Sequence, residues 1–385
     1  MLERLQLSNA SRIGLLTAIL IVTSGYAQAQ DFESIPFSDS RWEISGDDSG
    51  LESYRGQPSV RLDNGNGYAQ LGQVDFSNGI IEFDFAISSA AGFPGIQFRM
   101  QDDLNFEDVY FRAHMNAKDD ALAYAPTYDG NSTWQLFHGP GFWGNFTFEF
   151  GEWTHARMVI SGNQGELYLR DMETPVMFFH DLKMDEQDGL VGMRGGSDVH
   201  FANFKIAHVD NYPLKGQAPE WEADPEGVLN LTSWQISDPF NENLVADLTS
   251  LDEMTEEVTG WAALEADDSK IANVMRLHGI TEQENTVFAR VNLSSDSEVA
   301  KILELGYSDR VRVFLNGKKL YEGNNGFRSR DYRYLGSIGL FEKVVLPLNE
   351  GNNELWLALS ESFGGWGVLA RLENAGSVSL GGSTR

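Results

Sequence analysis

Two carboxylates, Glu82 and Asp84, lie two positions apart in the apolar stretch GIIEFDFAIS (residues 79–88). Side chains alternate between the two faces of a strand, so both carboxylates should lie with Ala86 on the face opposite Phe83. Two carboxyl groups within reach of one bond can act as general acid and general base. Carboxylates that meet arginines on neighbouring strands are instead structural, because each ion pair satisfies both charges.

The same alternation applies to the segments GIQFRM (residues 95–100) and DVYFRAH (residues 108–114). It places four polar side chains away from the core: Gln97, Arg99, Tyr110 and Arg112. If these strands neighbour residues 79–87, two arginines and two carboxylates share one polar face. We expect them to pair with one another, although a concave face of this composition can also hydrogen-bond sugar hydroxyls.

The segment between those two strands gathers oxygen ligands, namely Asp102, Asp103, Asn105 and Glu107. Carboxylate and amide oxygens suit calcium, and they also suit sugar hydroxyls. The spacing differs from that of a calcium-binding loop, so a solvated acidic hairpin loop is the favoured interpretation. Calcium is the cofactor that the sequence leaves open, since no motif supports a nucleotide, flavin, haem or zinc site.

Aromatic residues gather in a stretch broken by glycine and proline, residues 124–150. Of these, Trp134 and Trp143 are the candidates for stacking on pyranose rings, whose faces are apolar. The alternative is a small satellite core beneath a long loop.

The second half of the chain offers two further candidate sites. The segment GFRSRDYRYLG places Arg328 and Arg330 in a basic cluster, which suits recognition of an anionic group such as a sugar carboxylate or sulfate. The alternative, which we favour, is that these arginines bind the protein's own acids. Trp366 lies among glycines and is the candidate for an exposed aromatic platform.

The elements that must position these residues are short strands. Alternating segments separated by turn residues predict an all-β fold, with an antiparallel β-sandwich (jelly roll) over residues 30–210. Residues 211–226 are rich in proline and acids and predict a linker. A second, smaller β-sandwich should follow over residues 227–385, with a hairpin at Asn316-Gly317.

The N-terminus and the charge of the chain restrict where it acts and what it binds. Residues 1–29 combine arginines, an apolar run and a small-residue cleavage site, so they predict a signal peptide and a periplasmic or secreted protein. The formal net charge of −29 argues against nucleic acid and anionic membranes as partners. The chain has no cysteine, and hence neither a disulfide nor a cysteine-linked lipid anchor. The oligomeric state is left open.

Residues 30–210 resemble the concanavalin A-like lectin and glucanase superfamily, in particular its laminin-G-like and 3-keto-disaccharide-hydrolase-like modules. The segments that carry the resemblance are IIEFDFAI, GIQFRMQDDLNFEDVYFRAH, GEWTHARMVISGNQGELYLRD and GLVGMRGGSDVHFANFKI. Laminarinase-type enzymes of that superfamily carry Glu-x-Asp-x-Glu on one strand, with the first Glu as nucleophile and the last as acid/base. Glu82 and Asp84 match the first two positions, but Ala86 occupies the third, so the resemblance implies that this mechanism is lost.

The segments VRVFLNGKKLYEG, VVLPLNEGNNELWLAL and GGWGVLARLE resemble galactose-binding-like jelly-roll modules, which bind glycans or support a neighbouring domain. The sequence thus predicts non-catalytic binding of a polysaccharide or oligosaccharide on a concave face. The residues expected to bind it are Glu82, Asp84, Arg99, Asp102, Tyr110, Arg112, Trp134 and Trp143. One alternative is a hydrolase of a glycoside or 3-keto-disaccharide, with Glu82 or Asp84 as base and Asp102 or Glu107 as acid. The other is a protein-interaction module.

Overall fold

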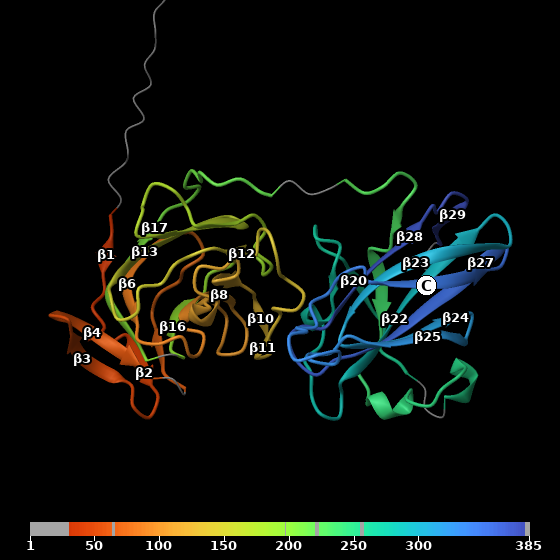
Figure 1. Cartoon of the computed structure of the whole chain (residues 1–385), viewed down its shortest axis with the longest axis horizontal. Coiled ribbons are helices and arrows are strands. Elements are labelled where there is room, and N and C mark those ends of the chain that lie inside the picture. The colour runs from red at the N-terminus through yellow and green to blue at the C-terminus, as the bar shows by residue number, and fades with distance from the viewer. Residues whose placement is uncertain (1–30, 64–65, 197, 220–222, 255–257, 382–385) are drawn as a thin grey trace, which may run out of the picture. The chain divides into compact units, whose positions relative to one another are not determined.

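The computed structural model describes residues 31–63, 66–196, 198–219, 223–254 and 258–381 (Figure 1). The predicted signal peptide, residues 1–29, lies outside the described residues. Within the described ranges, regular structure consists of strands and four short 3-10 helices, with no α-helix. The predicted all-β fold class, two successive antiparallel sandwiches, is confirmed.

The first sandwich consists of two antiparallel sheets. Sheet 1 has the strand order β15-β14-β13-β6-β17-β4-β3, with β1 also paired to β17. Its strands are β1 (Glu33–Ser34), β3 (Gly50–Tyr54), β4 (Gln57–Leu62), β6 (Gly79–Ile87), β13 (Thr154–Ser161), β14 (Gln164–Leu169), β15 (Met177–Phe179) and β17 (Val199–His208).

Sheet 2 has the strand order β12-β9-β8-β7-β16-β5-β2. Its strands are β2 (Trp42–Ser45), β5 (Tyr68–Leu71), β7 (Gly95–Met100), β8 (Glu107–Phe111), β9 (Leu122–Tyr124), β12 (Trp143–Gly144) and β16 (Leu190–Arg194). A 3-10 helix, η1 (Ala113–Met115), follows β8, and β10 (Thr127–Tyr128) pairs with β11 (Asn131–Ser132) in a small ribbon.

Apolar side chains from alternate positions of both sheets fill the space between them. Ile81, Phe83 and Phe85 of β6 meet Ile96 and Val109 of sheet 2 in one fully buried cluster. Since each of these residues lies one position away from a polar one, the period-two pattern of the sequence is what separates the core from the outer faces.

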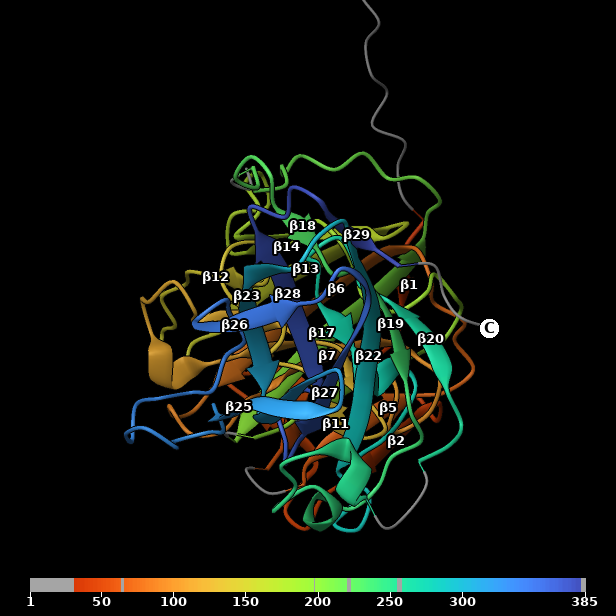
Figure 2. The same cartoon turned by 90° about the vertical axis from the view of Figure 1, so that its right-hand side faces the viewer.

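The second sandwich also has two sheets, which Figure 2 shows as two layers. Sheet 3 contains β18 (Leu229–Asn230), β21 (Ala272–Asn273), β23 (Val299–Ser308), β26 (Glu342–Leu348) and β28 (Gly367–Glu373). Sheet 4 contains β19 (Ser233–Ile236), β20 (Ala262–Glu265), β22 (Thr286–Ser295), β24 (Arg310–Leu315), β25 (Lys318–Asn324), β27 (Gly351–Ser360) and β29 (Val378–Leu380). The remaining 3-10 helices are η2 (Glu242–Leu244), η3 (Leu251–Glu253) and η4 (Val274–Arg276).

The predicted hairpin at Asn316-Gly317 is confirmed. Leu315 and Lys318 are paired across it, and both turn residues have positive φ, 49° and 83°. This is the two-residue turn that an Asn-Gly pair favours between antiparallel strands.

Gln135 connects the two sandwiches through a fully buried side chain. Its amide nitrogen donates to the carbonyl of Leu335 at 2.8 Å, and its amide oxygen accepts from the hydroxyl of Ser308 at 3.1 Å. The backbone of Gln135 adds bonds to Gly364 and Ile338, both at 2.8 Å. Every polar group of this residue is therefore satisfied by the second sandwich, as burial requires.

Candidate functional site

The structure places Glu82 and Asp84 on sheet 1, whereas Tyr110 lies on β8 of sheet 2 and Arg112 follows that strand. The expectation that they share one polar face is therefore wrong. The reason is that alternation identifies the non-core side of each strand, but it does not identify the sheet to which the strand belongs.

The partners of the two carboxylates come from sheet 1 itself. Arg157 donates to Glu82 at 2.7 Å, His155 bonds Asp84 at 2.7 Å, and Asn203 donates to Asp84 at 2.6 Å. Burial acts to raise the pKa of Asp84, but the hydrogen bonds from His155 and Asn203 outweigh it, and the pKa is lowered. Both carboxylates are thus engaged in cross-strand contacts of a structural kind.

Arg99 does not reach the polar face either, because β7 bulges at this position. Its φ is +49°, and the pairing of β7 with β16 shifts register there, which is a β-bulge. The fully buried guanidinium donates to the carbonyls of Ser77 at 2.9 Å and Gly162 at 2.6 Å. A bulge reverses the side on which the following residues project, so a parity argument that starts at Gln97 fails at Arg99.

The outer face of sheet 2 carries two rows of side chains that run across the strands. One row follows the pairings Ser45, Tyr68, Arg194, Gly95, Tyr110, Ala123 and Trp143. The next row follows Glu43, Gln70, Gly192, Gln97 and Asp108. Residues with small side chains therefore stand in the middle of the face, with larger polar and aromatic side chains around them.

Two of these small residues are required by close contacts. A Cβ atom on Gly192 would lie 2.2 Å from the hydroxyl of Tyr68, and one on Gly95 would lie 2.3 Å from the carbonyl oxygen of Val109. The Tyr68 ring lies over Gly192, and its hydroxyl donates to the sulfur of Met100 at 3.1 Å. Gly192 thus leaves room for the Tyr68 ring, and Gly95 for the backbone of β8.

Two cavities lie beside these rows and share Phe93 and Arg194, and we call the two together the sheet 2 groove. The first cavity has a volume of about 660 Å³ and is lined mainly by polar side chains, among them Glu43, Gln70, Gln97, Asp103 and Arg194. Asp103 accepts a hydrogen bond from Gln70 at 3.1 Å. Hydroxyl-bearing ligands would find both donors and acceptors here.

Asp108 lines neither cavity, but it lies beside Arg194, which lines both and donates to its Oδ2 at 2.6 Å. The residue is fully buried, and within the described residues its Oδ1 has no hydrogen-bond partner. Burial raises the pKa of Asp108 to about 6, against the opposing effect of Arg194. The Arg194 side chain remains about one-third exposed, so one part of it reaches the groove.

The second cavity has a volume of about 520 Å³ and is lined mainly by aromatic residues. From the first sandwich these are Phe93, Tyr110, Trp134 and Trp143. Phe93 stands edge-on to Tyr110 at 5.9 Å between ring centroids and is 41 % exposed. Both predicted tryptophans are half-buried and line this cavity.

Residues of the second sandwich line the same cavity: Phe327, Arg328, Leu335, Ser337 and Phe363. Trp134 packs against two of them, with ring centroids 6.1 Å from Phe327 and 6.2 Å from Phe363. The structure thus brings Tyr110, Arg112, Trp134, Trp143 and Arg328 of the predicted set to one cavity.

The acidic loop after β7 does not gather its oxygens. Asp102 caps the turn by accepting from the backbone of Leu104 at 2.8 Å, whereas Glu107 is fully buried and accepts from the Tyr124 hydroxyl at 2.7 Å. Burial raises the pKa of Glu107 to about 7. Nowhere in the described ranges do three or more His, Asp or Glu side chains form a group that could hold a metal ion.

The remaining candidates lie in the second sandwich. Arg330 pairs with Glu342 at 2.8 Å, as the favoured interpretation of the cluster expected. Trp366 is fully buried, and its indole nitrogen donates to the carbonyl of Leu359 at 3.1 Å. Its assignment as an exposed platform is wrong, since the flanking glycines leave space for the Leu136 side chain.

Sequence reasoning missed Phe93, Asp108 and Arg194. Alternation could have placed Arg194 on the outer face of sheet 2, because it lies two positions from Gly192 in β16. Asp108 also lies on the outer side of β8, but nothing in the sequence indicates that it faces Arg194. Phe93 lies in a loop, and no periodic pattern reports on it.

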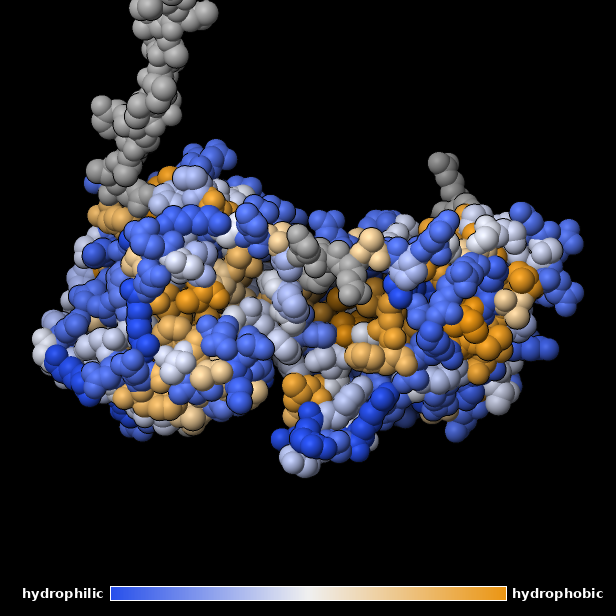
Figure 3. Space-filling view, turned by 45° about the horizontal axis from the view of Figure 1, so that its top comes forward, coloured by the Kyte–Doolittle hydropathy of each residue, from blue (hydrophilic) through white to orange (hydrophobic). Residues whose placement is uncertain are grey.

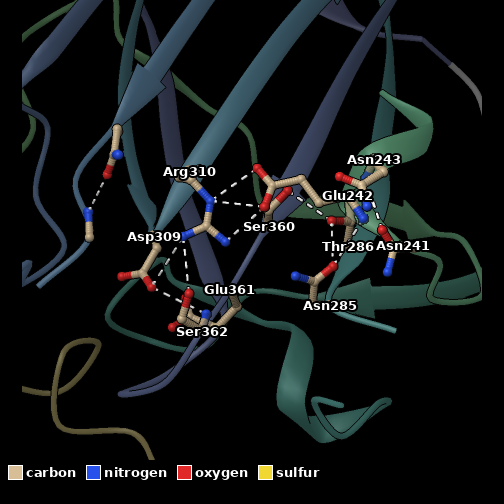
Figure 4. Close-up of polar contacts among 12 residues, drawn as sticks. Asn241, Glu242, Asn243, Asn285, Thr286, Asp309, Arg310, Ser360, Glu361 and Ser362 are labelled. Carbon is tan, nitrogen blue, oxygen red and sulfur yellow. Dashed lines mark hydrogen bonds and ion pairs between the residues drawn. The ribbon is translucent and has the colours of Figure 1, made fainter. Parts of the chain in front are cut away.

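A second polar cluster lies beside the end of β27, as Figure 4 shows. Arg310 lies between Glu242, which it contacts at 2.9 Å, and Asp309, at 3.8 Å. Asp309 and Glu361 are both buried, and each has one carboxyl oxygen without a partner in the part of the chain that is described. Burial raises both pKa values, and the charge of Asp309 raises that of Glu361 further.

Comparison with known proteins gives only distant similarity. No protein-family model matches the sequence, and no curated protein matches it. Among solved structures, 74 chains match. A carbohydrate-binding module of Bacillus subtilis is 15 % identical over 44 % of this chain and 94 % of its own, with a TM-score of 0.32. A β-glucanase of Bacillus licheniformis is 12 % identical over 47 % of this chain and all of its own, with a TM-score of 0.34.

A galectin of Caenorhabditis elegans is similar at the same level, with 15 % identity over 43 % of this chain, all of its own chain, and a TM-score of 0.28. Carbohydrate-binding modules, galectin-like folds and glucanases are therefore among the structural neighbours. At these identities and TM-scores the similarity assigns neither a family nor a ligand to this chain. The function has to be argued from the sheet 2 groove itself.

Proposed function

We propose that the protein binds a glycan, a polysaccharide or oligosaccharide, in the sheet 2 groove. The observation that carries this proposal is the joining of two cavities of different chemistry on one sheet face. The first is lined by side chains that donate and accept hydrogen bonds, and the second by half-buried aromatic rings. Sugars present both kinds of surface, since their ring faces are apolar and their rims carry hydroxyls.

The side chains on the floor suit this task because they are held in place. Gln97 is 5 % exposed and is flanked on its two neighbouring strands by Gly192 and Asp108. Arg194 is fixed by its ion pair with Asp108. Groups whose positions are fixed before binding lose less conformational freedom when a ligand arrives.

A hydrolase is the second candidate, and one observation favours it. Asp108 has a pKa of about 6, so close to neutral pH part of the population carries the proton that a general acid must donate. Glu43 and Asp103 line the adjoining cavity as further carboxylates. The Asp108 side chain is covered, however, so a substrate would have to displace Arg194 to reach it.

Exposed apolar surface keeps a protein-interaction role as a third possibility. Figure 3 shows hydrophobic residues in patches among hydrophilic ones. Phe341, at 60 % exposed, and Val345, at 56 %, are examples that lie outside the groove. We give this role lower weight, because scattered exposed apolar residues are normal on soluble proteins.

Affinity electrophoresis in gels that contain neutral or acidic polysaccharides tests the proposal. We expect at least one polysaccharide to retard the protein, and Gln97→Ala to reduce that retardation. Incubation of the retained polysaccharide with the protein, followed by analysis for released sugars, separates binding from hydrolysis. Unaltered migration in every gel would overturn the proposed function.

A further inference from the structure

We infer that the second cavity of the groove is a subsite for an anionic sugar, one that bears a carboxylate or a sulfate, and that Arg328 recognises the anion. This inference rests on the proposed function, because it concerns one end of the same groove. It assigns part of the ligand specificity to a loop of the second sandwich.

The charge of the cavity is the first argument. Three arginines and a histidine contribute to its lining, Arg112, His114, Arg194 and Arg328, whereas no lining residue is an acid. The chain as a whole carries a formal net charge of −29. A basic cavity on such an acidic protein is therefore a local feature, and it complements a negatively charged ligand.

The pairing of these arginines is the second argument. Arg112 is neutralised by Asp120 at 2.8 Å, and Arg194 by Asp108 at 2.6 Å. Arg328 forms no ion pair with any carboxylate of the described residues, and its guanidinium lies 4.8 Å from the centre of the Phe327 ring. It is exposed and therefore retains N–H groups for a planar or tetrahedral anion.

Other arginines of the same loop show that this is not a general property of the segment. Arg330 pairs with Glu342, and Arg333 with Asp331. Neither of them lines the cavity. Arg328 thus combines a position at the cavity with the absence of an internal partner.

The third argument is that Arg328 is held at the cavity. Its backbone N–H donates to the carbonyl of Tyr334 at 2.8 Å, which closes the loop on itself. The end of that loop is bound to Gln135, whose amide donates to Leu335. A sugar ring stacked on Trp143 or Trp134 would therefore meet a positioned cation from the second sandwich.

Isothermal titration calorimetry on the full chain tests the inference with two matched ligand pairs. One pair is an oligogalacturonate and its fully methyl-esterified form. The other is a sulfated galactan oligosaccharide and its desulfated form. We expect at least one acidic member to bind roughly tenfold more tightly than its neutral counterpart, as one charge-assisted hydrogen bond supplies. The pair that shows the preference identifies the anion as carboxylate or sulfate.

The variant Arg328→Gln should abolish this preference, so that the affinity for the acidic member falls to that of its neutral counterpart. Arg333→Gln is the control, since it removes the same charge from the same loop but away from the cavity. Equal affinities within both pairs, or equal losses in the two variants, would overturn the inference while leaving glycan binding intact. The absence of binding by any member of either pair, together with unaltered migration in all gels, would overturn both proposals.

Discussion

Arg194 of the sheet 2 groove forms an ion pair with the buried Asp108, with 2.6 Å between its Nη1 and the carboxylate Oδ2. This pair joins the two cavities, because Arg194 lines both of them. The net charge of the pair changes near pH 6, because burial raises the pKa of Asp108 to about 6. The pair is thus the point at which pH should act on binding.

The affinity for an acidic oligosaccharide should rise as the pH falls from 7 to 5. Above pH 6 the negative charge of Asp108 offsets Arg194, and protonation below that value removes the offset. A gain of roughly threefold to tenfold is expected from one charge at this range. His114, whose pKa burial lowers, acts in the same direction when it gains a proton. Asp108→Asn should bind tightly at pH 7 and lose most of the pH dependence; calorimetry at three pH values checks this.

Trp143→Ala should weaken glycan binding by about 1 kcal/mol or more, which is roughly a fivefold rise in the dissociation constant. The indole lines the aromatic cavity and is half-buried, so it offers a stacking face at little cost in ordering. Tyr332→Ala is the control, because this ring is 75 % exposed and does not line the groove. Equal binding by the two variants in affinity gels would contradict a stacking role.

Glu82→Gln should lower the stability of the fold without changing the affinity for the glycan. The Glu82 side chain is 7 % exposed and binds Arg157, so its loss leaves a guanidinium without its charged partner. The expected decrease in the free energy of unfolding is about 1–3 kcal/mol, measured by urea denaturation. Glu149→Gln, which breaks a largely exposed pair with Arg170, should cost less than about 1 kcal/mol. A loss of glycan binding in Glu82→Gln would contradict this prediction and indicate that β6 takes part in binding.

The Asp309 and Glu361 pair should contribute less to the stability of the fold as the pH rises. Both folded-state pKa values are raised, so the folded chain holds more protons than the unfolded chain above pH 4. The contribution of this pair to stability is then greatest at low pH and falls as the pH rises through the folded pKa values. Glutamine does not ionise, so Glu361→Gln avoids the buried charge that Glu361 carries at high pH. The variant should therefore melt at a higher temperature than the wild type at pH 8, but not at pH 4.5. Glu350→Gln, in an exposed turn, serves as the control.

The fold could be predicted because it depends on local patterns. Period-two alternation identified the strands, and the Asn316-Gly317 pair fixed a hairpin, since both signals act over a few residues. Alternation on β8 also placed Tyr110 and Arg112 on the outer face, where the structure has them. Tyr110 lies within the regular strand, and Arg112, one residue past its end, lines the same cavity.

The site could be predicted only in part, because its residues are brought together by long-range pairing. Nothing local shows that β6 lies in sheet 1 while β7 lies in sheet 2. A bulge at Arg99 changes parity without a proline or glycine to mark it. The approach of Arg328 to Trp134 depends on contacts between segments almost two hundred positions apart, which no periodicity reports.

The buried amide of Gln135 has a consequence for any use of the first sandwich alone as a glycan-binding reagent. Its four hydrogen-bond partners all belong to the second sandwich. Ile271 and Ile338 of the second half also belong to the apolar core of the first sandwich. A polypeptide cut in the segment 211–226 would expose these surfaces to water and lose Arg328 from the groove. An affinity probe made from this protein should therefore keep both sandwiches on one polypeptide.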